Sequence, residues 1–254
     1  MFEPLDAITR ASYRTFASLP GGTLIDDGEI FAVMNEVPLP FFNGVATTRM
    51  RDGARIAEVH EWYRARRRGF RWWVTPDSTP AGLDSLLEAH GFRHAYDSLG
   101  MTADLAKLKA VKPSELQIKR VRDLEEMTVW ADILTSVFKL TDADRQAWLD
   151  AFEALGFGDE SKWAHFTGYL FNQPVGIATV MTDGDIAGIY DVATVPAARG
   201  RGAGSTLTLH ALQLARDLGA RHAALQSSEM GESVYRSIGF VPGPTLRLYD
   251  WRPQ

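Results

Sequence analysis

The segment Asp191–Ser205 constrains the fold more than any other stretch of this chain. It predicts a strand that ends at Pro196, then a glycine-rich loop, then a helix that begins directly after the loop. The loop has glycine at every second position, namely Gly200, Gly202 and Gly204. Its backbone N–H groups are uncovered, and amides that open a helix lie at the positive end of the helix dipole. With Arg199 and Arg201 beside them, they are expected to bind a phosphate or pyrophosphate.

Two common phosphate-binding motifs match this loop poorly. A P-loop requires Gly-Lys-Ser or Gly-Lys-Thr, and no lysine lies near the loop. A dinucleotide-binding motif requires the spacing G-x-G-x-x-G and an acidic residue at the end of the next strand. Here the spacing is G-x-G-x-G, and the next strand ends in Leu225-Gln226-Ser227.

The loop instead has the spacing R-x-x-G-x-G, as Arg199-Gly-Arg-Gly202-Ala-Gly204, after the sequence V-A-T-V-P. This pattern resembles the acyl-CoA pyrophosphate loop of the GNAT superfamily of N-acyltransferases. The resemblance covers residues 116–251 and implies that acetyl-CoA, or another acyl-CoA, binds through backbone groups of the loop and of the preceding strand. The residues expected to bind it are Val192, Ala193, Thr194, Val195, Arg199, Gly200, Arg201, Gly202, Ala203, Gly204 and Ser205.

The composition narrows the class of protein further. The chain has 254 residues, 45% of them hydrophobic and 23% charged, which is typical of a folded protein of one or two domains. The absence of cysteine excludes disulfides, thiolate metal sites and cysteine nucleophiles, and the histidines do not cluster, so no metal site is expected. We expect a cytoplasmic protein without a membrane partner, because there is no leader and no apolar run of about 20 residues. The net charge of −5 argues against nucleic acid as a partner.

The hydrophobic pattern from residue 116 onward predicts the element order β-α-α-β-β-β-α-β-α-β, which is the GNAT order. Asp123 and Thr141 are expected to cap the first two helices. The helix after the loop is expected to bury Leu207, Ala211, Leu214 and Leu218. This order predicts an α/β (α+β) fold in which a mixed twisted sheet is flanked by helices.

The first half of the chain weakly repeats the second. Val45-Ala-Thr matches Val192-Ala-Thr, and a helix ending in Gly91-Phe matches one ending in Gly239-Phe, at almost the same offset. We therefore expect two tandem GNAT-like sheets, with a degenerate domain at 1–106, a linker at 107–115 and a catalytic domain at 116–254. The first copy has Asp52 where the second has its glycine-rich loop, which predicts that it has lost cofactor binding. The arginines at 64, 66, 67, 68 and 71 are interpreted as a solvated helix end.

Candidate catalytic residues follow from the chemistry of amine acylation. Tyr235 lies four residues before Gly239-Phe, where the resemblance implies the tyrosine that donates a proton to the departing thiolate. Many GNAT members have an asparagine seven residues earlier that contacts the pantetheine arm. This sequence has Ser228 there, which either makes such a contact or caps the helix. The base is Asp191, Glu229 or a chain of water molecules.

These observations predict an N-acyltransferase that transfers an acetyl or short acyl group to a primary amine by direct transfer in a ternary complex. The acceptor is a small molecule or a peptide amine, and the pattern leaves a homodimer open. Two alternatives remain. The first is a catalytically silent protein of the same fold that binds or senses acyl-CoA. The second is a dinucleotide-dependent oxidoreductase.

Overall fold

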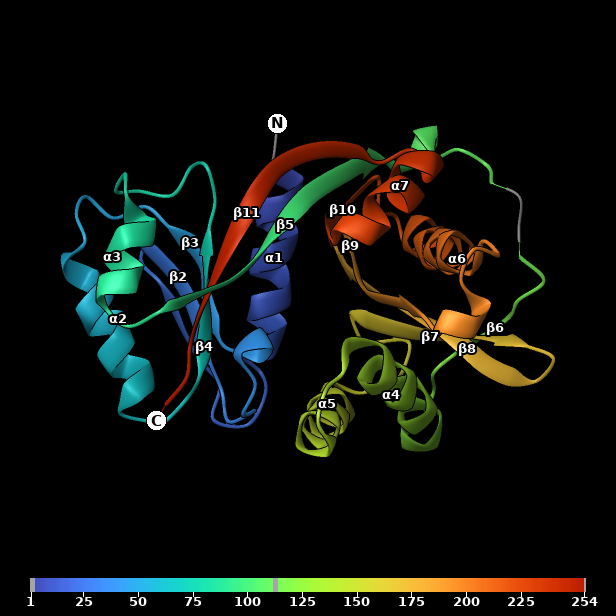
Figure 1. The fold of residues 1–254 in the computed structure, drawn as a ribbon, viewed down its shortest axis with the longest axis horizontal. Coiled ribbons are helices and arrows are strands. Elements are labelled where there is room, and N and C mark those ends of the chain that lie inside the picture. The colour runs from blue at the N-terminus through green and yellow to red at the C-terminus, as the bar shows by residue number, and fades with distance from the viewer. Residues whose placement is uncertain (1–2, 112–113, 254) are drawn as a thin grey trace. The chain divides into compact units, whose positions relative to one another are not determined.

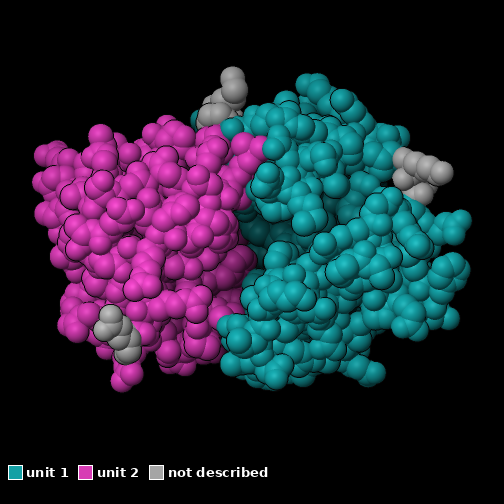
Figure 2. All heavy atoms as spheres, viewed as in Figure 1, with its two compact units in different colours: residues 1–8, 100–243 teal, residues 9–99, 244–254 magenta. Residues whose placement is uncertain are grey.

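The computed structural model describes residues 3–111 and 114–253. The chain divides into two compact units, which Figure 2 colours separately. Unit 1 comprises Met1–Ile8 and Gly100–Gly243, and unit 2 comprises Thr9–Leu99 and Pro244–Gln254. These units differ from the expected domains 1–106 and 116–254, because the C-terminal strand belongs with the first half of the chain.

Unit 2 contains a small mixed sheet. Its elements are α1 (Glu3–Phe16, which begins in unit 1), β1 (Thr23–Asp26), β2 (Ile30–Met34), η1 (Pro40–Phe42), β3 (Gly44–Thr48), α2 (Ala54–Arg64), β4 (Phe70–Val74) and α3 (Leu83–Ala89). Strands β1, β2 and β3 pair antiparallel, β3 and β4 pair parallel, and β4 pairs antiparallel with β11 (Val241–Trp251). An aromatic core holds this sheet, with the rings of Tyr63 and Phe70 stacked at 3.7 Å between centroids.

The ion pair between Arg71 and Asp250 joins the C-terminal strand to unit 2. Arg71 Nε lies 2.7 Å from Asp250 Oδ1, and the two side chains are only 12% and 16% exposed. Asp250 stands opposite Arg71 in the antiparallel register of β4 and β11. The interpretation of Arg71 as part of a solvated helix end is therefore wrong, because it lies on a strand and pairs with a carboxylate.

Unit 1 has the element order predicted for residues 116 onward. Its elements are the end of β5 (Arg93–Asp104), η2 (Leu105–Lys107), β6 (Gln117–Arg120), α4 (Leu124–Phe138), α5 (Asp142–Leu155), β7 (Trp163–Leu170), β8 (Gln173–Asp183), β9 (Ile186–Thr194), η3 (Pro196–Ala198), α6 (Ala203–Asp217), β10 (His222–Ser227) and α7 (Glu229–Ile238) (Figure 1). Strand β11 follows α7 in the chain, and only its first residues, 241–243, belong to unit 1. Asp123 and Thr141 cap α4 and α5 as expected. Strands β6 to β9 pair antiparallel, and β9 and β10 pair parallel.

Helices cover both faces of the sheet in unit 1. Neighbouring residues of β7 point to opposite faces. His165 contacts Trp130 of α4 and Phe152 of α5, whereas Phe166 contacts His210 of α6. Helices α4 and α5 therefore pack on one face and α6 on the other.

The buried stripe of α6 differs in part from the expected one. Leu207 and Ala211 are fully buried, together with Leu212 and Ala215. Leu214 is half-buried, and Leu218 is 58% exposed. Leu218 lies just beyond the end of the helix at Asp217, where it is the C-cap residue.

The mixed α/β character of the fold is confirmed, but the expectation of two separate sheets is wrong. Within the described residues, hydrogen bonds join eleven strands in the order β1-β2-β3-β4-β11-β5-β10-β9-β8-β7-β6. The two strands responsible are β11 and β5 (Arg93–Asp104), of 11 and 12 residues. Each is long enough to contribute residues to both units.

Candidate active site

The N-terminus of α6 has unsatisfied backbone donors. Gly202 is its N-cap residue, with φ 74° and ψ 9°, and no side chain caps the helix there. The N–H of Thr206 donates to the carbonyl of Gly202 at 3.0 Å. This first helical bond leaves the N–H groups at the next three positions, Ala203, Gly204 and Ser205, without a partner in the helix. A Cβ atom built on Gly200 would meet nothing within 4 Å, so the loop is open.

The other α-helices that follow residue 116, α4, α5 and α7, are capped by side chains. Asp123 accepts from the N–H of Glu126 in α4, and Thr141 forms a capping box with Asp144 in α5. Ser228 accepts from the N–H of Gly231 in α7. Helix α6 differs from these three in having glycine at the N-cap, so its amides remain available to an anion.

Strands β9 and β10 part beside this loop. Their parallel register runs from Ile186 opposite His222 to Ile189 opposite Leu225. Both strands continue beyond this register, β9 to Thr194 and β10 to Ser227. A strand whose neighbour has moved away exposes backbone groups that a ligand can pair with.

Thr194 shows which way those backbone groups point. The N–H of Val195 donates to the carbonyl of Val175 on β8 at 2.9 Å. Because the groups alternate along an antiparallel pair, the N–H and C=O of Thr194 point away from β8. Arg199 Nε donates to that carbonyl at 3.1 Å, which holds the arginine over the end of the strand.

A β-bulge directs Asp191 out of the regular alternation of β9. The register pairs Ile177 with Ala193 and Thr179 with Tyr190, so two residues of β9 oppose one of β8. Asp191 is one of these two, and its φ of 53° lies in the left-handed region. This conformation costs about 1 kcal/mol for most residues and less for aspartate or asparagine.

The bulge brings Asp191 close to Tyr235. Burial raises the pKa of the Asp191 carboxyl to about 7, and a hydrogen bond from Thr179 opposes this rise. Its Oδ2 atom is buried without a hydrogen-bond partner. Tyr235 is 8% exposed, and its pKa is raised by burial and by the charge of Asp191. Its ring lies against the start of α7, where a Cβ on Gly231 would come within 2.9 Å of it.

The remaining predicted site residues of α7 lie at its exposed N-terminus. The Ser228 hydroxyl accepts from Gly231 N–H at 3.2 Å, so it is the capping residue. The neighbouring Ser227 hydroxyl instead donates to the carbonyl of Ser228 at 2.7 Å. Glu229 is exposed in the first turn of the helix. The structure thus brings Asp191 and Tyr235 together and leaves Glu229 on the surface.

Two buried polar residues near Asp191 were not among the site residues predicted from the sequence. Thr179 lies on β8, and His165 lies on β7, with its Nδ1 atom 2.8 Å from the Thr179 hydroxyl. The available signal was weak. Each residue is a polar side chain within an otherwise apolar strand, and the spacing between them carries no motif.

In the corresponding loop of the first half of the chain, an acidic side chain already accepts a hydrogen bond from an amide at the start of the helix. The Asp52 carboxylate accepts from the N–H of Ala54, at the start of α2, at 2.9 Å. A Cβ on Gly53 would lie 2.9 Å from Leu86 Cδ1, so this loop is also closely packed. The two loops therefore differ in the donors they leave available.

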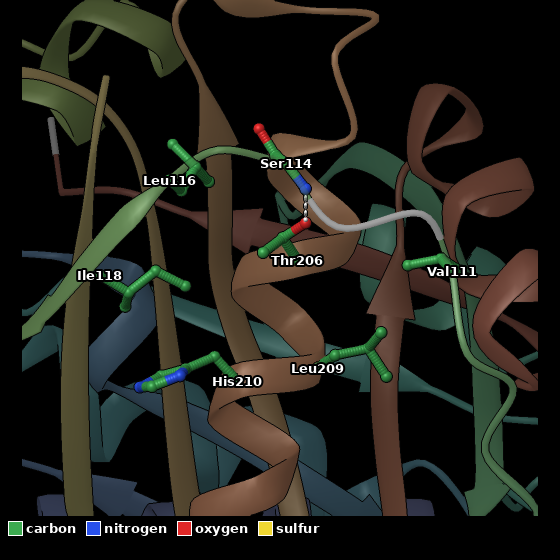
Figure 3. Close-up of a pocket in the computed structure, with 7 residues that line it drawn as sticks. All are labelled: Val111, Ser114, Leu116, Ile118, Thr206, Leu209 and His210. Atoms are coloured by element: carbon green, nitrogen blue, oxygen red, sulfur yellow. Dashed lines mark hydrogen bonds between the residues drawn. The ribbon is translucent and has the colours of Figure 1, made fainter. Parts of the chain in front are cut away.

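A pocket of about 510 Å³ lies elsewhere in unit 1. Figure 3 shows Leu116 and Ile118 on one side of it and Leu209 and His210 of α6 on the other. Its lining lies on the α6 face of the sheet and contains neither Asp191 nor Tyr235.

Comparison with known proteins identifies the fold. A GCN5-related N-acetyltransferase from Kribbella flavida matches over 98% of this chain and 95% of its own, with a TM-score of 0.74 and 17% identity. A functionally unknown conserved protein from Staphylococcus epidermidis ATCC 12228 matches over 92% and 95%, with a TM-score of 0.69 and 12% identity. A tandem GNAT protein from the clavulanic acid biosynthesis pathway matches over 92% and 84%, with a TM-score of 0.59 and 16% identity. The chain as a whole therefore has the GNAT fold.

A family model gives the narrower assignment. The acetyltransferase (GNAT) family model matches residues 128–240, the segment that carries the glycine-rich loop, Asp191 and Tyr235. This segment belongs to the GNAT family, and the resemblance drawn from the sequence is confirmed. Comparison with curated proteins found no match. Among the described residues, no helix is both long and apolar enough to cross a membrane.

Proposed function

We propose that this protein is an N-acyltransferase that uses an acyl-CoA, with acetyl-CoA as the first candidate, to acylate a primary amine. The observation that carries the proposal is the uncapped N-terminus of α6, placed where β9 and β10 part. An anion site and an unpaired strand end together suit a ligand that has a diphosphate at one end and amide groups along its arm.

The residues present fit such a ligand. The N–H groups of Ala203, Gly204 and Ser205 lie at the helix N-terminus, and Gly200 leaves the approach open. Arg199 and Arg201 are exposed beside them and add positive charge. The outward N–H of Thr194 offers a donor to the amide groups of the arm, next to the Thr194 carbonyl that accepts from Arg199 Nε. When bound, the acyl-CoA would supply the activated acyl group as a thioester.

Asp191 is the proposed base. An amine must lose a proton to become a nucleophile, and a base works best when its pKa lies near the working pH. Burial places the pKa of Asp191 at about 7, and its Oδ2 atom has no hydrogen-bond partner to displace. The proton would pass from the amine nitrogen to this oxygen. Glu229 is the weaker candidate because it is exposed.

Tyr235 is the proposed hydrogen-bond donor to the departing sulfur. Its raised pKa keeps the phenol protonated at neutral pH. Part of that rise comes from the charge of Asp191. When Asp191 accepts the proton of the amine, this charge disappears, so Tyr235 becomes a stronger acid as the thiolate leaves. Base and acid are therefore coupled in the order that the reaction requires.

Gly202→Asp tests the anion site. The introduced carboxylate would accept the free amides of α6, as Asp52 does at α2, and would repel a phosphate. Two like charges about 5 Å apart repel by about 3 kcal/mol at an effective dielectric constant of about 20. Because the loop is exposed and screening reduces this value, we expect CoA affinity, measured by calorimetry, to fall at least about tenfold.

Gly82→Asp is the matched control. Gly82 is the N-cap of α3, with φ 77° and ψ 18°, almost the conformation of Gly202. Both variants bear the same backbone strain, and only Gly202→Asp should weaken CoA binding. Equal losses of CoA affinity in the two variants would contradict the assignment of the loop at Gly202 as the CoA-binding site.

Thermal-shift titration addresses the oxidoreductase alternative, since stabilisation by NAD or NADP and not by CoA would favour it. Release of the CoA thiol during turnover can be followed with a thiol reagent, because the chain contains no cysteine. CoA binding without thiol release for any amine tested would favour the silent binding protein.

A further inference from the structure

A chain of polar side chains crosses three neighbouring strands beneath α4 and α5. His165 on β7 stands opposite Thr179 on β8, and Thr179 stands opposite Tyr190 on β9. The bulge then turns Asp191, the next residue, toward Thr179, which hydrogen-bonds its carboxyl. His165 and Thr179 are 1% and 0% exposed. Most polar groups buried this deeply have partners that compensate the loss of water.

His165 is a neutral hydrogen-bonding group. Burial and the nearby charge of Arg120 lower its pKa to about 3, so it does not take up a proton near neutral pH. Its Nε2 atom is buried without a partner, and Nδ1 lies 2.8 Å from the Thr179 hydroxyl. A buried N–H without an acceptor is rarer than a buried acceptor without a donor, which favours the hydrogen on Nδ1. Nδ1–H then donates to Thr179, and the single hydroxyl hydrogen of Thr179 is left for Asp191.

We propose that His165 and Thr179 are positioning residues for Asp191, holding its carboxylate in the conformation and charge state in which it accepts a proton. The proposal rests on the function proposed above. His165 orients the hydroxyl of Thr179, and Thr179 stabilises the ionised carboxylate. The Oδ2 atom of Asp191, which has no protein partner, remains for the amine.

The chain opposes the effect of burial on Asp191. A hydrogen bond donated to a carboxylate favours its ionised form, whereas burial favours the protonated form. Without the Thr179 hydroxyl the carboxyl would keep its proton to higher pH and would be a poorer base at neutral pH. Neighbouring charged groups are not among the causes of the shifted pKa of Asp191. Arg120 on β6 lowers the pKa of His165, and the charge of Asp191 raises the pKa of Tyr235 on α7. Helices α4 and α5 present the uncharged Trp130 and Phe152 to His165.

The test is the pKa of Asp191 itself, measured by NMR on protein labelled at the aspartate carboxyl carbon. The Asp191→Asn variant identifies the signal. Thr179→Val removes the hydroxyl at nearly constant volume and should raise the pKa of Asp191 by at least about half a unit, which corresponds to roughly 0.7 kcal/mol. Thr179→Ser, which restores the hydroxyl, should restore the wild-type value.

His165→Phe and His165→Asn form a second pair of variants. Phenylalanine keeps an aromatic ring between Trp130 and Phe152 and removes the donor to Thr179. The pKa of Asp191 should therefore rise in His165→Phe, but by less than in Thr179→Val. Asparagine keeps a donor close to the place of Nδ1, so the pKa of Asp191 should shift less in His165→Asn than in His165→Phe. Thr179 and His165 contribute differently to packing. The two His165 variants therefore still test the proposal if Thr179→Val does not fold.

The outcomes separate this inference from the proposed function. Loss of acyl transfer in Asp191→Asn, with an unchanged Asp191 pKa in Thr179→Val and His165→Phe, would overturn the positioning role and leave the acyltransferase standing. A raised pKa in both variants would support the positioning role even if no amine were acylated. If turnover is seen, the acid limb of its pH profile should move upward in Thr179→Val by the same amount as the NMR value.

Discussion

The stability of Asp191→Asn as a function of pH tests the electrostatic basis of the site. In the folded protein the carboxyl keeps its proton up to about pH 7, whereas its ordinary pKa is 3.8. Between these values the folded state binds more protons than the unfolded state, so stability falls as the pH rises. The contribution of the protonated Asp191 carboxyl to the free energy of unfolding is present in full below pH 3.8 and is lost as the pH rises through about 7. Asparagine cannot ionise and lacks this dependence.

The size of the effect follows from the shift. A rise of about three units corresponds to about 4 kcal/mol, at about 1.36 kcal/mol for each unit. This is an upper bound because Asp191 is half-buried over the residue as a whole and water screens part of the charge. We expect about 2 kcal/mol, or about 4–8 °C in melting temperature for a protein of this size. Asparagine also tolerates the left-handed backbone at this position, so the substitution adds little strain.

Urea unfolding of both proteins, followed by tryptophan fluorescence, measures the difference at each pH. Asp191→Asn should equal the wild type at about pH 3 and become the more stable protein by about pH 8. The acid end of the series is the internal control, because both side chains are neutral there. A difference that stays constant with pH, or a wild type that is more stable above neutrality, would show that the carboxylate is compensated by partners and would refute its role as a base with raised pKa.

Two further predictions concern the donor to the sulfur and the C-terminal strand. Tyr235→Phe should reduce turnover with a competent amine by about tenfold or more, or about 1.4 kcal/mol in the barrier, while calorimetry shows unchanged CoA affinity; equal rates would favour the silent binding protein. Arg71→Ala leaves Asp250 as a buried unpaired charge and should lower the free energy of unfolding by about 3–5 kcal/mol, measured by urea unfolding. The control is Arg64→Ala, which removes an exposed ion pair and should lower the free energy of unfolding by less than about 1 kcal/mol.

Local features of this protein are predictable from its sequence. The strand, loop and helix around Gly202 follow from proline, glycine and apolar spacing, which act over a few neighbouring residues. The caps at Asp123 and Thr141 are recognisable because a capping side chain bonds an amide only a turn away. The element order after residue 116 follows from the same short-range signals. The family resemblance carried by the loop was confirmed for residues 128–240.

The surroundings of the candidate base were decided by tertiary structure. Asp191 was one of three options in the sequence, and neither His165 nor Thr179 was among the candidates. Their convergence depends on the register of three strands and on a bulge of one residue, and a shift of register by one residue would turn each side chain to the opposite face. No local pattern specifies such a register.

The pairing of the C-terminal strand was also decided by tertiary structure. Its sequence predicts a strand but contains no information about its partner, which the structure shows to be β4 of unit 2 for residues 247–251. The Arg71–Asp250 pair, which buries two opposite charges far apart in the chain, accompanies this pairing. The sequence by itself determined the glycine-rich loop and the helix it opens, because glycine and helix geometry act locally. Tertiary structure alone decided which distant polar groups surround Asp191, because hydrogen bonds between strands set those distances.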